Sequence, residues 1–179
     1  MIYMFLAEGF EEVEALAPLD LLRRAGLSVK TVGVGGKVIT GAHGISVLAD
    51  LTDAEYSDDT PELIFLPGGM PGTLNLAASE VVQSAIATAV RTNAYLAAIC
   101  AAPSILGDLG LLGDKEAICY PGFEDRLTGA TVSKKHVVCD GKILTAAGMG
   151  VAVEFGLAII EELLGKVKAE ALRRAVIAD

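Results

Sequence analysis

The chain has 179 residues, of which 53% are hydrophobic and 21% are charged. This composition is typical of one folded domain, and it excludes disordered, collagen-like and disulfide-scaffold proteins. The 14 Lys and Arg residues against 23 Asp and Glu residues give a formal net charge of −9, which argues against a basic patch for nucleic acid or anionic membrane. We therefore expect a single acidic domain over residues 1–179.

Cysteine usage and the apolar segments indicate where the protein works. Three cysteines without close spacing do not suit a disulfide framework or a zinc site, so a reducing compartment is favoured. The apolar start Met1–Leu6 is short, lacks a positive flank and runs into Glu8, which predicts a strand rather than a signal peptide. The segment Val151–Leu164 contains glutamates and is too short to span a bilayer. We expect a cytoplasmic protein with no membrane partner.

Short apolar runs alternate with longer amphipathic segments along the chain. Unbroken apolar runs typical of strands buried on both faces of a parallel sheet are Ile2–Ala7, Val29–Val34, Leu63–Leu66 and Tyr95–Ile99. Amphipathic patterns predict helices over Phe10–Ala25, Ser79–Thr92, Gly150–Leu164 and Lys166–Ala178. Residues 115–143 are more irregular, with short strands expected at Thr131–Val132, His136–Cys139 and Lys142–Leu144. This alternation predicts an open α/β sandwich with a mostly parallel sheet.

Several binding motifs are absent or incomplete. The glycine-rich run Gly33–Val38 lacks the third glycine of a dinucleotide fingerprint and follows the second predicted strand instead of the first. No Gly-Lys pair has the upstream glycine of a phosphate-binding loop. The two histidines, His43 and His136, are far apart and have no ligand spacing around them. We expect no bound cofactor and no metal.

Cys100 follows the predicted strand Tyr95–Ile99 and precedes a helix-forming stretch with Pro103 in its first turn. The small residues Ala98 and Ala102 leave room for a sharp strand-to-helix turn that exposes a nucleophile. Because a helix N-terminus favours thiolate, we expect a thiol pKa of roughly 5–6 instead of about 8.5. The alternative is that Cys100 is a small buried hydrophobic residue, as most free cysteines are.

Residues 66–72 end another buried strand with the sequence LPGGMPG, whose backbone must bend tightly. Gly68 and Gly69 can therefore aim main-chain N–H groups into a cleft, as an oxyanion hole requires. In a doubly wound sheet this loop and the Cys100 turn would open on the same carboxyl edge, where ligands bind. The alternative is an ordinary loop between a strand and a helix.

Glu14 is the acidic residue of most interest in the first predicted helix. It shares one stripe with Phe10 and Leu21, which places a carboxyl group on an apolar face. A partly buried carboxyl has a raised pKa and can stay protonated beside a thiolate. Glu11 and Glu12 suit the other interpretation, a solvated acidic first turn that complements the helix dipole.

Together these segments resemble a known family. The motifs that carry the resemblance are AEGFEEVE (residues 7–14), LPGG (66–69) and AICAAP (98–103), with further matches over residues 18–26 and 153–160. They resemble the DJ-1/ThiJ/PfpI superfamily, in its DJ-1/YajL-like branch, essentially from end to end. The resemblance implies a flavodoxin-like, doubly wound sheet sandwiched by helices, a homodimer, and a reactive Cys100 hydrogen-bonded to a protonated Glu14. Gly69 and Ala101 would then be the main-chain donors of the oxyanion pocket.

The sequence departs from the family pattern at three positions around this pocket. Tyr120 stands where many relatives carry a histidine near the nucleophile. His43 stands where DJ-1 has an arginine that reaches toward the partner subunit, although a plain surface-loop residue fits His43 equally well. Met70 replaces a polar residue, so the mouth of the pocket is expected to be more apolar.

The resemblance implies cofactor-independent glyoxalase or deglycase chemistry on methylglyoxal, glyoxal or glycated substrates. Cys100 would form the hemithioacetal and Glu14 would move the proton. The alternative is an oxidative-stress sensor or redox-regulated chaperone that works through oxidation of Cys100, since both functions need a reactive thiolate. A cysteine peptidase or amidase is disfavoured because Tyr120 cannot relay a proton to a leaving amine as histidine does.

Overall fold

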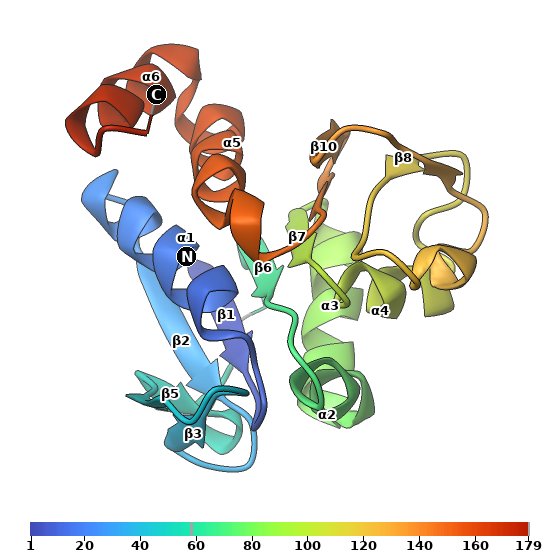
Figure 1. Ribbon diagram of the computed structural model, residues 1–179. Coiled ribbons are helices and arrows are strands. Elements are labelled where there is room, and N and C mark those ends of the chain that lie inside the picture. The colour runs from blue at the N-terminus through green and yellow to red at the C-terminus, as the bar shows by residue number, and fades with distance from the viewer. Residues whose placement is uncertain (58, 179) are drawn as a thin grey trace.

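The computed structural model describes residues 1–57 and 59–178, and its centre is a seven-stranded sheet (Figure 1). In spatial order the strands are β10 (Val137–Asp140), β11 (Ile143–Ala146), β7 (Tyr95–Ile99), β6 (Leu63–Leu66), β1 (Ile2–Leu6), β2 (Val29–Gly33) and β5 (Leu51–Thr52). All neighbours in this sheet are parallel except β10 and β11, which form an antiparallel pair at one edge. The predicted α/β fold with a mostly parallel sheet is confirmed.

Helices cover both faces of the sheet, as a doubly wound fold requires. Residues of β1 alternate between two separate cores: Met4 packs with the helices α1 (Glu12–Arg24) and α5 (Ala152–Leu164), whereas Phe5 packs toward α3 (Glu80–Thr92) and α4 (Pro103–Asp108). Figure 1 shows α1 and α5 together, apart from α3 and α4. Both faces of the central strands are therefore buried, which explains their unbroken apolar sequences.

The helices α1 and α5 pack closely because α5 carries a glycine at the contact. A Cβ atom on Gly156 would lie 2.8 Å from the Leu21 side chain and 3.1 Å from the Cα of Pro18. This close packing fixes α1, and with it the acidic residues of its first turn, against the rest of the molecule.

Element boundaries differ from the predicted ones where caps decide them. The first helix begins at Glu12 instead of Phe10, because the Glu11 carboxylate accepts a hydrogen bond of 2.7 Å from the Glu14 N–H and caps the helix. Ser79 caps α3 as predicted. The 3₁₀ turn η3 (Met149–Val151) precedes α5, and α6 (Lys166–Ala175) ends three residues earlier than expected. Strand β9 (Thr131–Val132) has its predicted bounds, and β10 and β11 begin one residue later than predicted.

Short elements were missing from the prediction. They are the hairpin β3 (Val38–Thr40) and β4 (Ser46–Leu48), strand β8 (Glu116–Ala117), helix α2 (Gly72–Ala78), and the 3₁₀ turns η1 (Asp53–Glu55) and η2 (Glu124–Arg126). Strand β5 was also missed. These elements are too short for a periodic apolar pattern, so hydrophobic periodicity carries no signal for them.

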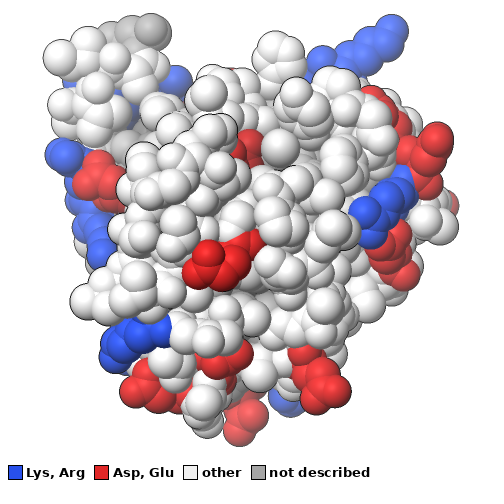
Figure 2. All heavy atoms as spheres, turned by 60° about the horizontal axis from the view of Figure 1, so that its bottom comes forward, with Lys and Arg blue, Asp and Glu red and all other residues white. Residues whose placement is uncertain are grey.

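The surface agrees with the acidic composition. Figure 2, in which the lower end of Figure 1 faces the reader, is largely uncharged at its centre apart from a few acidic side chains, and its Lys and Arg residues are scattered around the rim. This face therefore offers no basic patch. Among the described helices, none combines the length and apolarity needed to cross a membrane.

Candidate functional site

Cys100 occupies the sharp turn between β7 and α4. Its φ of +64° lies in the left-handed region, which a non-glycine residue adopts only where the surroundings hold it. Two backbone hydrogen bonds do so: the Cys100 N–H donates to the Ala146 carbonyl at 2.9 Å, and the Tyr120 N–H donates to the Cys100 carbonyl at 2.7 Å. Helix α4 starts at Pro103, immediately after the turn. The predicted strand-to-helix elbow is confirmed.

The loop after β6 touches this elbow through glycine. A Cβ atom on Gly68 would lie 2.5 Å from Glu14 Oε2 and 2.6 Å from the Cβ of Cys100, so only glycine fits between the two side chains. Gly69 has a φ of +92°, a conformation that favours glycine. The main-chain N–H groups of Gly69 and Ala101 both interact with the Cys100 sulfur. The loop and the elbow therefore form one site.

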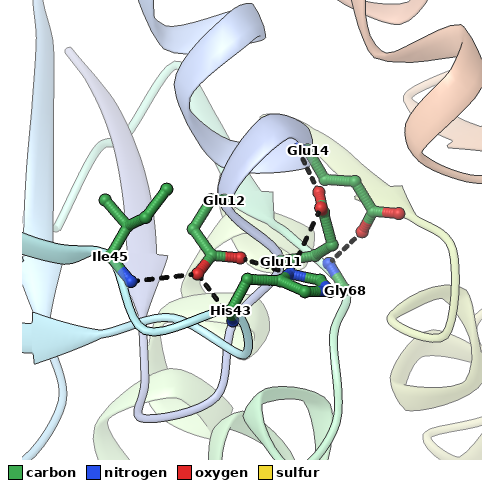
Figure 3. Close-up of polar contacts among 6 residues, drawn as sticks. All are labelled: Glu11, Glu12, Glu14, His43, Ile45 and Gly68. Carbon is green, nitrogen blue, oxygen red and sulfur yellow. Dashed lines mark hydrogen bonds and ion pairs between the residues drawn. The ribbon is translucent and has the colours of Figure 1, made fainter.

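Glu14 points into this site from the first turn of α1 (Figure 3). Its side chain is only 1% exposed, and its Oε2 accepts a hydrogen bond of 3.0 Å from the Gly68 N–H. Burial raises the pKa of Glu14 to about 7, with a smaller contribution from the charge of Glu11. Hydrogen bonds with Cys100 and with the N–H groups of Gly68 and Met149 act in the opposite direction but do not outweigh burial.

The thiol of Cys100 behaves differently from the sequence-based expectation. Burial, the charge on an ionised Glu14 and the hydrogen bond with Glu14 together raise the pKa of the thiol to about 12, and the N–H groups of Ala101 and Gly69 offset only part of this rise. The pKa of roughly 5–6 expected from the helix N-terminus does not hold for the thiol beside an ionised Glu14. For the thiol beside a protonated Glu14, the state that the resemblance implies, it stays a prediction.

The pair of Cys100 and Glu14 carries one negative charge near neutral pH. The pair loses its first proton near pH 7 and resists losing the second until far above it. Glu14 is almost fully buried, whereas Cys100 is partly exposed and faces two N–H groups. Transfer of the thiol proton to the carboxylate therefore moves the charge to the better-solvated group, and it creates a nucleophile and an acid together.

Glu12 is also buried, which the sequence interpretation did not expect. Its side chain is 4% exposed and points away from Glu14, toward the loop between β3 and β4 (Figure 3). There it accepts hydrogen bonds from the backbone N–H groups of His43 at 2.7 Å and Ile45 at 3.4 Å, and it contacts the Nδ1 of His43 at 2.9 Å. The interpretation of Glu12 as a solvated residue is wrong, because it anchors this loop to α1.

His43 is held at this anchor rather than against the nucleophile. Its side chain is 70% exposed, and hydrogen bonding to Glu12 raises its pKa. Donor atoms of Glu11, Glu12 and His43 lie within 4.8 Å of one another, so among the described residues this group has a spacing that suits a metal ion. Spacing along the chain could not indicate this group, because His43 is 31 residues from Glu12.

The family model for the DJ-1/PfpI family matches residues 1–162, which include every residue of the candidate site. The chain belongs to the DJ-1/PfpI family. It is 38% identical to Protein DJ-1 homolog B of Arabidopsis thaliana over 92% of this chain, but it spans only 38% of that longer protein. It is 34% identical to Protein dj-1beta of Drosophila melanogaster over 97% of this chain and 95% of the relative. Similarity extends to the glutathione-independent glyoxalase DJR-1.2 of Caenorhabditis elegans, at 31% identity over 92% of this chain and 89% of that protein.

Solved structures agree with the family membership. Oxidised Toxoplasma gondii DJ-1 superposes with a TM-score of 0.94 at 31% identity, covering 98% of this chain and 97% of that one. The flavodoxin-like arrangement expected for a DJ-1/PfpI family member is therefore confirmed for this chain.

Two groups at this DJ-1/PfpI site lay outside the sequence-based set. The Met149 N–H reaches Glu14, and Glu11 caps the helix that carries Glu14. Gly148 and Gly150 lie on either side of Met149 at the start of a predicted helix, and this pair of glycines is a turn signal that could have indicated the role of the Met149 N–H. Of the predicted site residues, Cys100, Glu14, Gly68, Gly69 and Ala101 come together. Tyr120 is linked to Cys100 through its backbone and is 51% exposed, and His43 lies at the Glu12 anchor.

Proposed function

We propose that this DJ-1/PfpI family member converts methylglyoxal and glyoxal to lactate and glycolate without glutathione. The observation that carries this proposal is the contact between Cys100 and the buried Glu14, which shares one negative charge between a nucleophile and a proton carrier. The name of the nematode relative, a glutathione-independent glyoxalase, supports the same reaction class.

In the proposed reaction the Cys100 thiol gives its proton to the Glu14 carboxylate while the sulfur attacks the aldehyde carbon. The oxygen of the resulting hemithioacetal accepts hydrogen bonds from the N–H groups of Gly69 and Ala101, which lie at the sulfur. Negative charge that develops on that oxygen is stabilised by fixed dipoles that need no reorganisation.

Glu14 then moves a proton between the two carbons. After it has protonated the hemithioacetal oxygen, its carboxylate removes the hydrogen of the former aldehyde carbon as a proton, which gives an enediolate with its negative charge on the neighbouring oxygen. Glu14 returns this proton to the neighbouring carbon while the hydroxyl proton of the former aldehyde carbon passes to the neighbouring oxygen, which gives a thioester of the 2-hydroxy acid. Water cleaves the thioester and restores the thiol, so the net change is the addition of one water molecule to the dicarbonyl. Displacement of the thiol or amine from a hemithioacetal or aminocarbinol by Cys100 would release the glycated group and give deglycase activity through the same enzyme-bound hemithioacetal.

Lactate formation from methylglyoxal, measured without glutathione, tests the proposal. We expect activity in the wild type and none in Cys100→Ser or Glu14→Gln. Cys139→Ser is the matched control, because Cys139 lies on β10 at the edge of the sheet and is exposed. Absence of lactate with the wild type, or undiminished activity in Cys100→Ser, would refute the proposal.

Oxidation of Cys100 is the second candidate function. It is supported by the two N–H groups at the sulfur, which would also stabilise a sulfinate, and by the oxidised state named for the Toxoplasma relative. The same proton transfer to Glu14 that would activate Cys100 for attack on an aldehyde would also supply the thiolate that peroxide oxidises. Peroxide titration followed by intact mass tests this function, because a sensor gains two oxygens at Cys100 at low peroxide excess.

Two further expectations stay predictions. The resemblance implies a homodimer, and exposed Val13 on α1 and Val153 on α5 offer apolar surface on two helices that pack together. Sedimentation of the purified protein measures the oligomeric state. Cytoplasmic residence rests on the cysteine usage and is measured by fractionation of cells that express the chain.

A further inference from the structure

A surface pocket of about 390 Å³ lies beside the candidate site, and the proposed reaction does not use it. It is lined by Tyr120, Pro121, His136, Ala147, Gly148, Met149, Gly150 and Val151. Apart from the Tyr120 hydroxyl and the His136 imidazole, every side chain in this lining is apolar. No lysine or arginine is part of it, so it does not suit a phosphate or a carboxylate.

The pocket wall adjoins the Glu14 carboxyl group at a glycine. A Cβ atom on Gly148 would lie 3.3 Å from the Tyr120 ring and 3.9 Å from Glu14 Oε1. The missing side chain therefore leaves a gap between the Tyr120 ring and Glu14 Oε1, the Gly148 passage. The neighbouring Met149 contributes its side chain to the pocket and its N–H to Glu14, so both features belong to one turn of backbone.

Gly148 is not required for the backbone conformation. Its φ of 161° and ψ of −171° describe extended backbone, which any residue adopts. The glycine at this position is therefore explained by the limited space around it and not by the backbone conformation. This distinguishes Gly148 from Gly69, whose positive φ explains the glycine without reference to a ligand.

We propose that this pocket binds the apolar substituent of a 2-oxoaldehyde larger than methylglyoxal, an aryl or branched-alkyl glyoxal, while the dicarbonyl reaches Cys100 and Glu14. This inference rests on the proposed function and names the substrate class of the same site. The methyl group of methylglyoxal is too small to fill a pocket of this volume. A phenyl or branched-alkyl group buries apolar surface against Tyr120, Met149 and Val151, and the free energy of that contact is available in the transition state.

The ratio of kcat/KM for phenylglyoxal to kcat/KM for methylglyoxal tests the proposal, because general damage to the enzyme cancels in a ratio. We expect a ratio of at least about 10 in the wild type, in line with the discrimination that apolar pockets achieve. A phenylglyoxal with a carboxylate on its ring should lose this advantage. Gly148→Ala, which narrows the passage, and Val151→Ser, which makes the wall polar, should each lower the ratio by about fivefold or more. The matched control Val167→Ser, on the exposed surface of α6 outside this pocket, should leave the ratio unchanged.

Failure of this proposal is distinguishable from failure of the proposed function. If methylglyoxal is converted but the ratio is near 1 and does not respond to Gly148→Ala or Val151→Ser, the subsite is wrong and the glyoxalase activity stands. If neither substrate is converted, binding of the unreactive ketone acetophenone decides whether the pocket accepts an aryl group. We expect it to shift the methyl resonance of Met149 in methyl-labelled wild-type protein and to shift it less in Val151→Ser. No shift of Met149 would overturn the proposal.

Discussion

The carboxyl group of Glu14 and the thiol of Cys100 share a hydrogen bond where α1, the loop after β6 and the turn after β7 meet. The hydrogen bond from the Cys100 thiol favours charge on Glu14, whereas an ionised Glu14 disfavours charge on Cys100, so the pair has two well-separated ionisations in place of two independent ones. The first of these, near pH 7, falls in the range where a proton carrier is most useful.

Turnover should follow this first ionisation. We expect kcat/KM for methylglyoxal to rise with pH through about 7, because the fully protonated pair lacks both a thiolate and a base. In Glu14→Gln, turnover should fall by about 100-fold or more and the rise should disappear, while Cys100 still reacts with iodoacetamide. A pH–rate profile of each protein measures this, and an unchanged rise in the variant would assign it to another group.

The ionisation of Glu14 should affect folding stability in the opposite direction, so that stability falls as the pH rises. The pKa of Glu14 is raised from 4.5 to about 7 on folding, so the folded state favours the protonated form. Its contribution to stability is fully present below pH 4.5 and is lost as the pH rises through about 7, which amounts to about 3 kcal/mol. Glu14→Gln removes this loss, so its stability relative to wild type should be higher at pH 8 than at pH 4. Urea unfolding at both values measures the difference, and equal differences at both would contradict the raised pKa.

The contact between Glu12 and His43 predicts a separate effect. Glu12→Gln should lower the pKa of His43, because the hydrogen bond and the negative charge that raise it are weakened. Glu12 stabilises the protonated form of the His43 imidazole in the folded state. The contribution of this contact to folding stability is therefore present below the ordinary pKa of 6.5 and is lost as the pH rises through the raised pKa. NMR titration of the imidazole measures the shift. Turnover should stay within about tenfold of wild type, since Glu12 points away from Glu14 (Figure 3), and a larger loss would show that the loop anchor supports catalysis.

Gly68→Ala should abolish turnover. The added methyl group would need the space of Glu14 Oε2 and of the Cys100 side chain, so the pair must separate. Gly36→Ala is the matched control, because a Cβ atom at Gly36 meets open space. Both variants should fold, with Gly68→Ala less stable by about 1–3 kcal/mol, the usual cost of an overpacked core. Lactate formation and thermal unfolding of the two proteins test this, and normal turnover in Gly68→Ala would contradict the tight contact.

Much of the fold followed from local pattern. The four unbroken apolar runs became the central strands, and Ser79 and Pro103 mark helix starts as their chemistry requires. The elbow at Cys100 was also predictable, because small residues on both sides of it and a following helix are properties of consecutive residues.

Selection among the acidic residues of α1 was predictable only in part. The helical stripe correctly assigned Glu14 to the buried face, because helix geometry fixes which residues point the same way. The same reasoning predicted that Glu12 is exposed to solvent, which is wrong. Its burial depends on the loop at His43, which comes from a hairpin that has no periodic signal.

Charge and space at the site were decided by tertiary structure. The sequence alone determined that a cysteine stands at a helix N-terminus, and this predicts a lowered thiol pKa. Folding then buried the sulfur and placed Glu14 against it, and these longer-range effects outweigh the local dipole. The passage at Gly148 likewise exists only because β11 delivers that glycine between Tyr120 and Glu14, residues separated by more than a hundred positions in the chain. Desolvation and close contact depend on what the rest of the molecule brings to a point in space, and the order of residues along the chain does not contain that information directly.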